Sequence, residues 1–336
     1  MKTIKLFNII KCFITFVFPF LLITAVVSVL LGDSHTSFIS SLVLPFLVVL
    51  NCIQILFLLI KRSKKALVNL VALLMFFCCF DSFYQYNTNA KPSNSSIKIL
   101  SFNTYQFKTS ARGVDNGERK IVDFVKKQNA DIVCFQEFSA TKYKLFVDDY
   151  PYWVKTNIMM PYKSVLSVFS KYPIIDTGYV EFFDTKNNTM YVDISINGEI
   201  LRFYNVHLES YKTSTIYQLN NPNSYKPLIE RVFEADKIRA EQAQLVKDHL
   251  EGFKGKSIIV GDFNSTQYSP VYRILKKGKK DTFTEAGKGF GGTFYLFNYP
   301  FKIDHILVDE TVEVVNHENF NIDLSDHEPI LAEIKL

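Results

Sequence analysis

Several polar side chains that could bind a metal ion or a phosphate group lie at the ends of short apolar runs. Asp262 and Asn264 directly follow the run "SIIVG", with Phe263 between them. Because side chains two residues apart on an extended chain point to the same side, both can face one pocket while Phe263 returns to the core. Comparable candidates, each following or interrupting another apolar run, are Asn103, Glu137, His207, Asp304, His305, Asp326 and His327.

The residue types of this set favour one kind of chemistry. Carboxylate and amide oxygens are the ligands that a hard divalent cation such as Mg²⁺ or Mn²⁺ prefers. The region after residue 90 contains a single cysteine, Cys134, so a zinc cluster of cysteines is excluded there. A carboxylate beside a histidine suits a hydrolytic site. Taken singly, each candidate is more simply interpreted as a turn or cap residue, but the combination predicts a metal-dependent hydrolytic site.

The sequence after residue 96 predicts one α/β domain. Short apolar runs typical of strands alternate with amphipathic stretches typical of helices, the longest of which covers residues 228–253. About 240 residues of this kind are within the size of a single large domain. We assign residues 97–336 to this domain and the polar segment 86–96 to a linker.

Residues 1–85 are predicted to form a membrane anchor. Uncharged runs cover residues 13–31, 38–60 and 66–80, and about 20 apolar residues are needed to cross a bilayer as a helix. The third run is short, and a core helix of a soluble protein is its alternative interpretation. The predicted transmembrane helices cover residues 9–31, 37–60 and 66–84.

The distribution of lysine and arginine predicts the orientation of this anchor. The N-terminus carries three lysines, the first loop carries no basic residue, and the second loop, "KRSKK", carries four. Positive residues favour the cytoplasmic side. Three crossings then place the α/β domain on the periplasmic or extracellular side of a bacterial-type inner membrane, with the bilayer as a partner. If the third run does not cross, the domain is cytoplasmic.

The net charge of +5 belongs to the anchor. Residues 1–90 contain 7 Lys or Arg and 2 Asp or Glu, which leaves 31 of each (38 − 7 and 33 − 2) for residues 91–336. The α/β domain is therefore formally neutral. Neutrality argues against a long basic groove for nucleic acid.

Six segments together resemble the endonuclease/exonuclease/phosphatase superfamily. They are "LSFNTYQF", "IVCFQEF", "NVHLES", "IIVGDFNS", "KIDHILV" and "SDHEPI". The resemblance covers residues 96–336. It implies a four-layer α/β sandwich with two central mixed sheets. It also implies hydrolysis of a phosphoester bond by metal-assisted, in-line attack of water.

The resemblance also implies a role for each carboxylate and amide of the set. Glu137 would be the main metal ligand, with Asn103 nearby and Asp326 completing the metal site. Asp262 would orient or deprotonate the attacking water, and Asn264 would hold that water or a phosphate oxygen.

The remaining implied roles concern basic residues. His327 would contact the phosphate and be polarised by Asp304, and His207 would bind phosphate or assist the leaving group. Lys302 stands where many relatives have Arg and would contact substrate. His305 occupies a position where Tyr is frequent, and a structural role is the favoured interpretation.

Three functions are consistent with the sequence. The favoured one is a membrane-anchored phosphodiesterase acting on nucleic acid. The second keeps the chemistry but takes a phospholipid or sphingolipid as substrate, which tethering beside a bilayer would suit. The third is a non-catalytic binding domain, against which the complete set of catalytic residue types argues. No protein partner is inferred.

Overall fold

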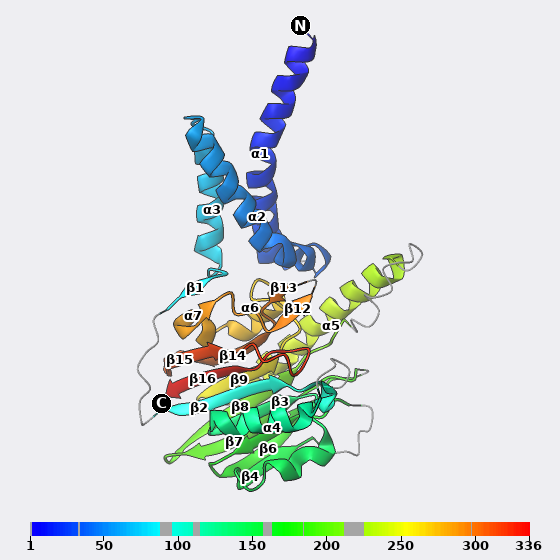
Figure 1. Ribbon diagram of the computed structural model, residues 1–336, viewed down its shortest axis with the longest axis vertical. Coiled ribbons are helices and arrows are strands. Elements are labelled where there is room, and N and C mark those ends of the chain that lie inside the picture. The colour runs from blue at the N-terminus through cyan, green and yellow to red at the C-terminus, as the bar shows by residue number, and fades with distance from the viewer. Residues whose placement is uncertain are drawn as a thin grey trace. The chain divides into compact units, whose positions relative to one another are not determined.

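The computed structural model divides into two compact units (Figure 1). One comprises Met1–Phe83 with Tyr268–Pro270, and the other comprises Tyr84–Gln267 with Val271–Leu336. The structure describes the backbone of residues 2–32, 34–87, 96–109, 115–156, 163–183, 185–211, 225–296 and 298–336. Most of the predicted linker, residues 88–95, lies outside this description, and Tyr86 at its start belongs to strand β1 (Gln85–Tyr86).

The first unit is helical and is built from α1 (Lys2–Leu31), α2 (Ser34–Ile60) and α3 (Ala66–Cys79). Buried apolar side chains such as Val26, Leu44 and Phe76 form its interior. One polar side chain also joins two of the helices. Asn51 Nδ2 donates to the carbonyl of Phe18 at 3.2 Å and to that of Leu47 at 2.8 Å. The hydrogen bond to Phe18 links α2 to α1 through a polar contact between otherwise apolar helices.

The prediction of three membrane-crossing helices is not borne out by the described residues, which contain one candidate. The candidate is the stretch Thr36–Ile60 of α2, 25 residues with a mean hydropathy of 2.7. The 14 residues of α3 reach only about 21 Å at 1.5 Å per residue, less than the ~30 Å hydrocarbon core. The described apolar part of α1, Thr15–Leu31, is also short. The predicted multi-pass topology and periplasmic placement rested on three crossings and lose that support.

The second unit contains two six-stranded mixed sheets. In the first sheet the order is β15-β16-β2-β3-β5-β4, and only the β2–β3 pair is parallel. In the second the order is β10-β14-β9-β8-β7-β6, and only the β8–β9 pair is parallel. The strands are β2 (Ile97–Asn103), β3 (Ile132–Gln136), β4 (Tyr152–Lys155), β5 (Ser167–Ser170), β6 (Ile174–Val180), β7 (Asn188–Ile196), β8 (Glu199–His207), β9 (Ser257–Asp262), β10 (Lys279–Asp281), β14 (Asp304–Asp309), β15 (Glu313–Asn319) and β16 (Ile330–Lys335).

Helices and short strand pairs complete this unit. The short strand pairs are β1 with β11 and β12 with β13. The remaining elements are η1 (Tyr105–Phe107), α4 (Gly117–Gln128), η3 (Ala140–Leu145), α5 (Tyr225–Glu251), α6 (Pro270–Lys276), α7 (Thr282–Ala286), β11 (Lys288–Gly289), β12 (Phe294–Leu296) and β13 (Tyr299–Phe301).

Alternation along the strands builds three apolar layers. On β8, Phe203 joins the core between the two sheets, whereas its neighbour Tyr204 joins the core beneath α5 and α6. The outer face of the first sheet packs against α4 through Ile121 and Val125. Each sheet is therefore covered on both faces, which its almost continuous apolar strands require. The predicted α/β fold with two mixed sheets is confirmed.

A polar contact crosses the core between the two sheets. Gln136 on β3 donates from Nε2 to Asn205 Oδ1 on β8 at 2.7 Å, and both side chains are fully buried. Asn205 Nδ2 in turn donates to the carbonyls of Phe135 and Ser167 at 3.0 and 3.1 Å. Because buried amides must be paired, this contact fixes β3 against β8. Glu137 follows β3 and His207 ends β8, so it also fixes the spacing of two candidate site residues.

Gly261 allows β9 to pass through this crowded region. Its φ is +131°, and a Cβ at this position would lie 2.2 Å from the carbonyl oxygen of Val206 and 2.9 Å from Gln136 Nε2. Both contacts are shorter than any side chain tolerates. Only glycine therefore lets the chain deliver Asp262 to the end of β9.

We expect Gly261→Ala to lower the free energy of unfolding by about 2–5 kcal/mol, because backbone strain and overpacking add. Gly278→Ala is the matched control. Gly278 has a φ of +75°, but no heavy atom lies within 4 Å of the point that a Cβ would occupy, so only about 1 kcal/mol should be lost. Urea unfolding in detergent, followed by Trp153 fluorescence, measures both. Equal losses in the two variants would contradict the steric argument.

Candidate active site

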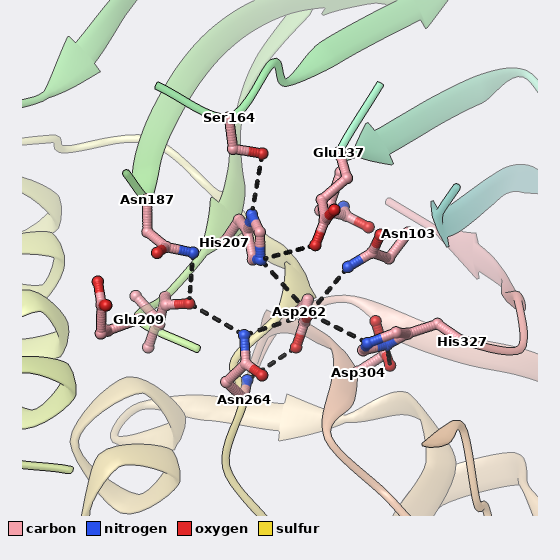
Figure 2. A network of polar contacts seen from close by, with 12 residues as sticks. Asn103, Glu137, Ser164, Asn187, His207, Glu209, Asp262, Asn264, Asp304 and His327 are labelled. Atoms are coloured by element: carbon pink, nitrogen blue, oxygen red, sulfur yellow. Dashed lines mark hydrogen bonds and ion pairs between the residues drawn. The ribbon is translucent and has the colours of Figure 1, made fainter. Parts of the chain in front are cut away.

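Strand pairing brings the candidate residues together where the central strands of the two sheets end (Figure 2). In the second sheet, Asp262 pairs with His207 on one side and with Asp304 on the other. In the first sheet, Asn103 pairs with Gln136, the residue before Glu137. His327 lies in the loop before β16 and reaches Asp304. The residues thus come from six separate segments but surround a single carboxylate, that of Asp262.

Asp262 is the centre of the hydrogen-bond network. Its side chain is 1% exposed and accepts from Asn103 Nδ2 at 3.0 Å. It also accepts from the backbone N–H of Asn264 at 2.8 Å and from Asn264 Nδ2 at 3.3 Å. Burial raises the pKa of Asp262 to about 6, opposed by the nearby rings of His327 and His207. The group can therefore exchange a proton near neutral pH.

The contacts of Asn264 determine which atom of its amide faces the site. Nδ2 donates to the carbonyl of Leu208 at 3.0 Å and to Asp262 at 3.3 Å. Both partners are acceptors, so the nitrogen must point toward them and both amide hydrogens are used. Oδ1 is left to accept a hydrogen bond. An acceptor in this position suits a water molecule better than an unprotonated phosphate oxygen.

His327 lies between two carboxylates. Its Nδ1 is 2.9 Å from Asp304 Oδ2, and its Nε2 is 3.6 Å from Asp262 Oδ2. Burial alone would lower the pKa of His327, but Asp304 and Asp262 raise it well above its usual value. The ring is therefore an imidazolium, a fixed positive charge beside Asp262.

His207 has the opposite electrostatic character. Its Nδ1 is 3.2 Å from the Ser164 hydroxyl, and its Nε2 is 3.7 Å from both Glu137 Oε1 and Asp262 Oδ2. Among the described residues, Nε2 has no hydrogen-bond partner although it is buried. Burial lowers the pKa of His207. The neutral ring thus points Nε2 toward Asp262 and Glu137, and Figure 2 shows these two directions.

Glu137, Asn103 and Asp326 fit a hard divalent cation. Burial and the neighbouring charge of Asp326 raise the pKa of Glu137, so the two carboxylates repel each other across a small space. The Ser325 hydroxyl donates to the backbone carbonyl of Asn103 at 2.7 Å and lies 3.2 Å from Asp326 Oδ1, which places Asn103 and Asp326 close together. A cation among these oxygens would remove the repulsion, and oxygen ligands of this kind suit Mg²⁺ or Mn²⁺.

A second group of potential ligands lies beside the first. One ligand atom each from Asp262, Asp304 and His327 lies within 4.8 Å of the others. In the present arrangement, however, His327 is paired with Asp304, and Asp262 already accepts from Asn103 and Asn264. This group therefore fits proton transfer and charge stabilisation better than metal binding.

The backbone of Glu137 is held in an unusual conformation. Its φ is +45°, in the left-handed region that few residues other than glycine occupy. Its carbonyl accepts from the backbone N–H of Gln106 at 2.7 Å and from the hydroxyl of Thr104 at 3.1 Å. Strain of this kind is usually retained where a side chain must point in one direction. Here that direction is toward Asn103 and His207.

A model of the endonuclease/exonuclease/phosphatase family matches residues 100–327 of the sequence. The chain belongs to this family. Members of the family are metal-dependent hydrolases of phosphoester bonds. No curated protein matches the sequence.

Solved structures show the same fold at low sequence identity. An endonuclease/exonuclease/phosphatase from Bacteroides vulgatus is 18% identical, with a TM-score of 0.51 over 72% of this chain and 100% of that chain. A Bacteroides thetaiotaomicron mannosyl-6-phosphatase is 19% identical, with a TM-score of 0.53 and the same coverages. D. rerio TDP2 complexed with single strand DNA product is 16% identical, with a TM-score of 0.54 and again the same coverages.

The structure does not bring Lys302 to the site residues. Its Nζ donates to Asp281 Oδ2 at 2.8 Å and lies 2.6 Å from His305 Nδ1, and all three side chains are buried. Burial alone would raise the pKa of Asp281, but Lys302 and His305 hold it well below its usual value. Tyr272 also donates its hydroxyl to Asp281 at 2.8 Å. The Lys302 ammonium therefore stabilises a buried cluster, consistent with the structural role expected of His305, and has no described contact with the site.

Sequence reasoning missed several groups that support the site. Ser164 contacts His207, and the carbonyl of Leu208 accepts from the side chains of both Asn264 and Asn187. Ser164 stands directly before the apolar run "VLSVF", and Asn187 lies in the polar segment "DTKNNT", so neither has the position after an apolar run that marks the predicted candidates. Leu208 lies inside the quoted segment "NVHLES". Its role is played by the backbone carbonyl, which every residue type has, so the sequence does not reveal it.

Proposed function

We propose that this protein hydrolyses phosphodiester bonds of nucleic acid by divalent-metal-assisted attack of water. The observation that carries the proposal is the convergence of Asn103, Asn264, His207 and His327 on the carboxylate of Asp262. One group able to take a proton near neutral pH is thus surrounded by donors and by one fixed positive charge. A non-catalytic binding domain would have no need of such an arrangement.

Glu137, Asn103 and Asp326 would hold the cation. When bound, a divalent cation neutralises charge on the phosphate oxygens and makes the phosphorus easier to attack. Asn264 Oδ1 accepts a hydrogen bond from the attacking water and orients it. Asp262 takes a proton from that water as the new P–O bond forms and the bond to the leaving oxygen breaks.

The two histidines serve different parts of the reaction. The imidazolium of His327 stabilises the negative charge that builds on the phosphate oxygens, and Asp304 keeps the ring protonated and oriented. His207 is neutral and directs Nε2 to the same space. It donates a hydrogen bond from Nε2 to a phosphate oxygen or to the leaving oxygen.

Two observations support nucleic acid as the substrate class. D. rerio TDP2, which shares the fold, is complexed with a single strand DNA product. The ring of Phe294 lies 5.2 Å from that of His327, centroid to centroid, and its half-buried face offers a surface on which a base could stack. The neutral charge of the domain favours short or single-stranded substrates over a long duplex.

We also propose that the protein is anchored in a bilayer. The helix over residues 36–60 supports this, because only 22% of its most apolar window is buried within the structure. The domain would lie on the periplasmic side if the helical unit crosses the membrane an odd number of times. The protein should sediment with membranes and resist extraction by alkaline carbonate. Release by carbonate would contradict anchoring.

The activity itself is tested with the full chain in detergent on single-stranded DNA, RNA, plasmid DNA, sphingomyelin, phosphoinositides and mannose 6-phosphate. We expect DNA or RNA to be cleaved only with added Mg²⁺ or Mn²⁺, and excess chelator to abolish cleavage. Asp262→Asn and His327→Ala should each lower kcat by about 10³-fold or more, because each removes a group needed in the transition state.

His249→Ala is the matched control, since His249 hydrogen bonds to the Tyr204 hydroxyl away from the site and should keep wild-type kcat. Equal turnover in excess chelator would disprove the metal requirement. Preferential hydrolysis of a lipid or a sugar phosphate would overturn the proposed substrate class.

The raised pKa of Asp262 predicts the acid side of the pH profile. Asp262 must be ionised to accept a proton, so kcat/KM should fall about tenfold per pH unit below a pH of about 6. The profile is measured at two Mg²⁺ concentrations. If loss of the metal causes the fall in kcat/KM, the pH at which the fall begins should change with the Mg²⁺ concentration. If protonation of Asp262 causes it, that pH should stay the same. A break near pH 4, the ordinary range of an aspartate, would contradict the raised pKa.

A further inference from the structure

A buried cluster of polar side chains surrounds Glu209, two residues after His207 in the chain. Its central residue is Arg239 of α5, whose side chain has no exposed surface. Nη1 donates to the carbonyl of Glu209 at 2.9 Å, and Nη2 donates to Asp236 at 3.2 Å and to the hydroxyl of Tyr211. The guanidinium also lies 3.8 Å from the centroid of the Tyr211 ring. A fully buried arginine is rare and costly, so its contacts need an explanation.

Two further side chains hold Glu209 from other directions. Gln242, one helical turn after Arg239, accepts from the backbone N–H of Glu209 at 2.8 Å. The Thr185 hydroxyl donates to the Glu209 carboxylate and accepts from the backbone N–H of Asn187 at 3.1 Å. The N–H, the carbonyl and the side chain of Glu209 are therefore each bound to a different residue.

The N–H of Glu209 belongs to the same peptide group as the carbonyl of Leu208. A peptide group is planar, with its N–H and C=O pointing in opposite directions. Binding of the N–H by Gln242 therefore fixes the direction of the Leu208 carbonyl. That carbonyl accepts from Asn187 Nδ2 at 2.8 Å and from Asn264 Nδ2 at 3.0 Å.

We propose that Arg239, Gln242 and Thr185 are positioning residues that set the orientation of the Asn264 amide through the Leu208–Glu209 peptide. α5 holds Glu209, the peptide plane carries that constraint to the Leu208 carbonyl, and the carbonyl binds Asn264 Nδ2. Asn264 Oδ1 is then directed at the attacking water. The inference rests on the proposed hydrolytic function, and it assigns to α5 a role in catalysis without contact with substrate.

Gln242→Met is the first test, because it removes the acceptor for the Glu209 N–H and keeps the volume of the side chain. We expect kcat of the full chain on single-stranded DNA with Mg²⁺ to fall about 10–100-fold, the scale of small displacements in an active site. KM should change little, since substrate contacts remain. Gln244→Met is the matched control. Gln244 lies on the same helix, is exposed, and bonds to Asp248 at 2.6 Å, so kcat should stay at the wild-type value.

Thr185 offers a second and gentler pair of variants. Thr185→Val replaces the hydroxyl with a methyl group of similar volume, whereas Thr185→Ser keeps the hydroxyl. We expect Thr185→Val to lower kcat and Thr185→Ser to retain it. This pair decides the question if Gln242→Met does not fold, which circular dichroism and a melting curve report.

A double-mutant cycle with Asn264→Ala separates positioning from a merely structural role. If Gln242 acts through Asn264, Gln242→Met should reduce kcat strongly in the wild type but by less than about threefold in the Asn264→Ala background. Equal reductions in both backgrounds would overturn the proposal, as would a folded Gln242→Met variant with wild-type kcat. Either result leaves the proposed function intact. A wild-type protein without activity on any phosphoester would overturn both.

Discussion

The site depends on keeping one carboxylate ionisable while it is almost completely buried. Removing Asp262 from water disfavours its charged form, and that cost raises its pKa to about 6. Three donors from Asn103 and Asn264 and the charge of His327 limit the rise. The result is a group that is ionised at neutral pH and still basic enough to take a proton. The neighbouring elements of the site keep Asp262 buried and at the same time hold the donors and the charge that keep it ionisable.

The two sheets supply that support through pairing and through one polar contact between them. Register places His207 and Asp304 on either side of Asp262, so their distances from it depend on backbone hydrogen bonds rather than on mobile loops. Glu137 comes from the other sheet, and its position relative to His207 depends on the contact between Gln136 and Asn205. Gly261 is the point where this arrangement leaves no room for a side chain. The close packing that excludes a side chain at position 261 therefore also fixes the distances between the site residues.

Much of this arrangement could be predicted from the sequence because it follows from alternation and residue type. The mixed α/β fold follows from local pattern and is confirmed. Phe263 is buried as expected, but Asp262 and Asn264 meet through a turn and not along an extended strand, because Asn264 has a φ of +49° and its N–H donates to Asp262. The resemblance implies that Lys302 contacts substrate, but a matching position in a family motif does not show where a long side chain finds its partner, here Asp281. The three uncharged runs predict three crossings, but α3 ends at Cys79 after 14 residues, before the predicted end at residue 84. Contacts to backbone carbonyls, such as that of Leu208, depend on the fold and not on residue type.

The two histidines show that the group in contact with Nδ1 determines whether the ring is charged. His207 and His327 both direct Nε2 toward Asp262 at nearly equal distances, 3.7 and 3.6 Å. Nδ1 of His327 is paired with the carboxylate of Asp304, which raises the pKa of the ring. Nδ1 of His207 instead contacts the neutral hydroxyl of Ser164. Burial then keeps His207 uncharged. Two imidazolium rings around one carboxylate would stabilise its charge so strongly that it could no longer act as a base. One charged and one neutral histidine leave Asp262 basic while still providing a cation for the phosphate oxygens.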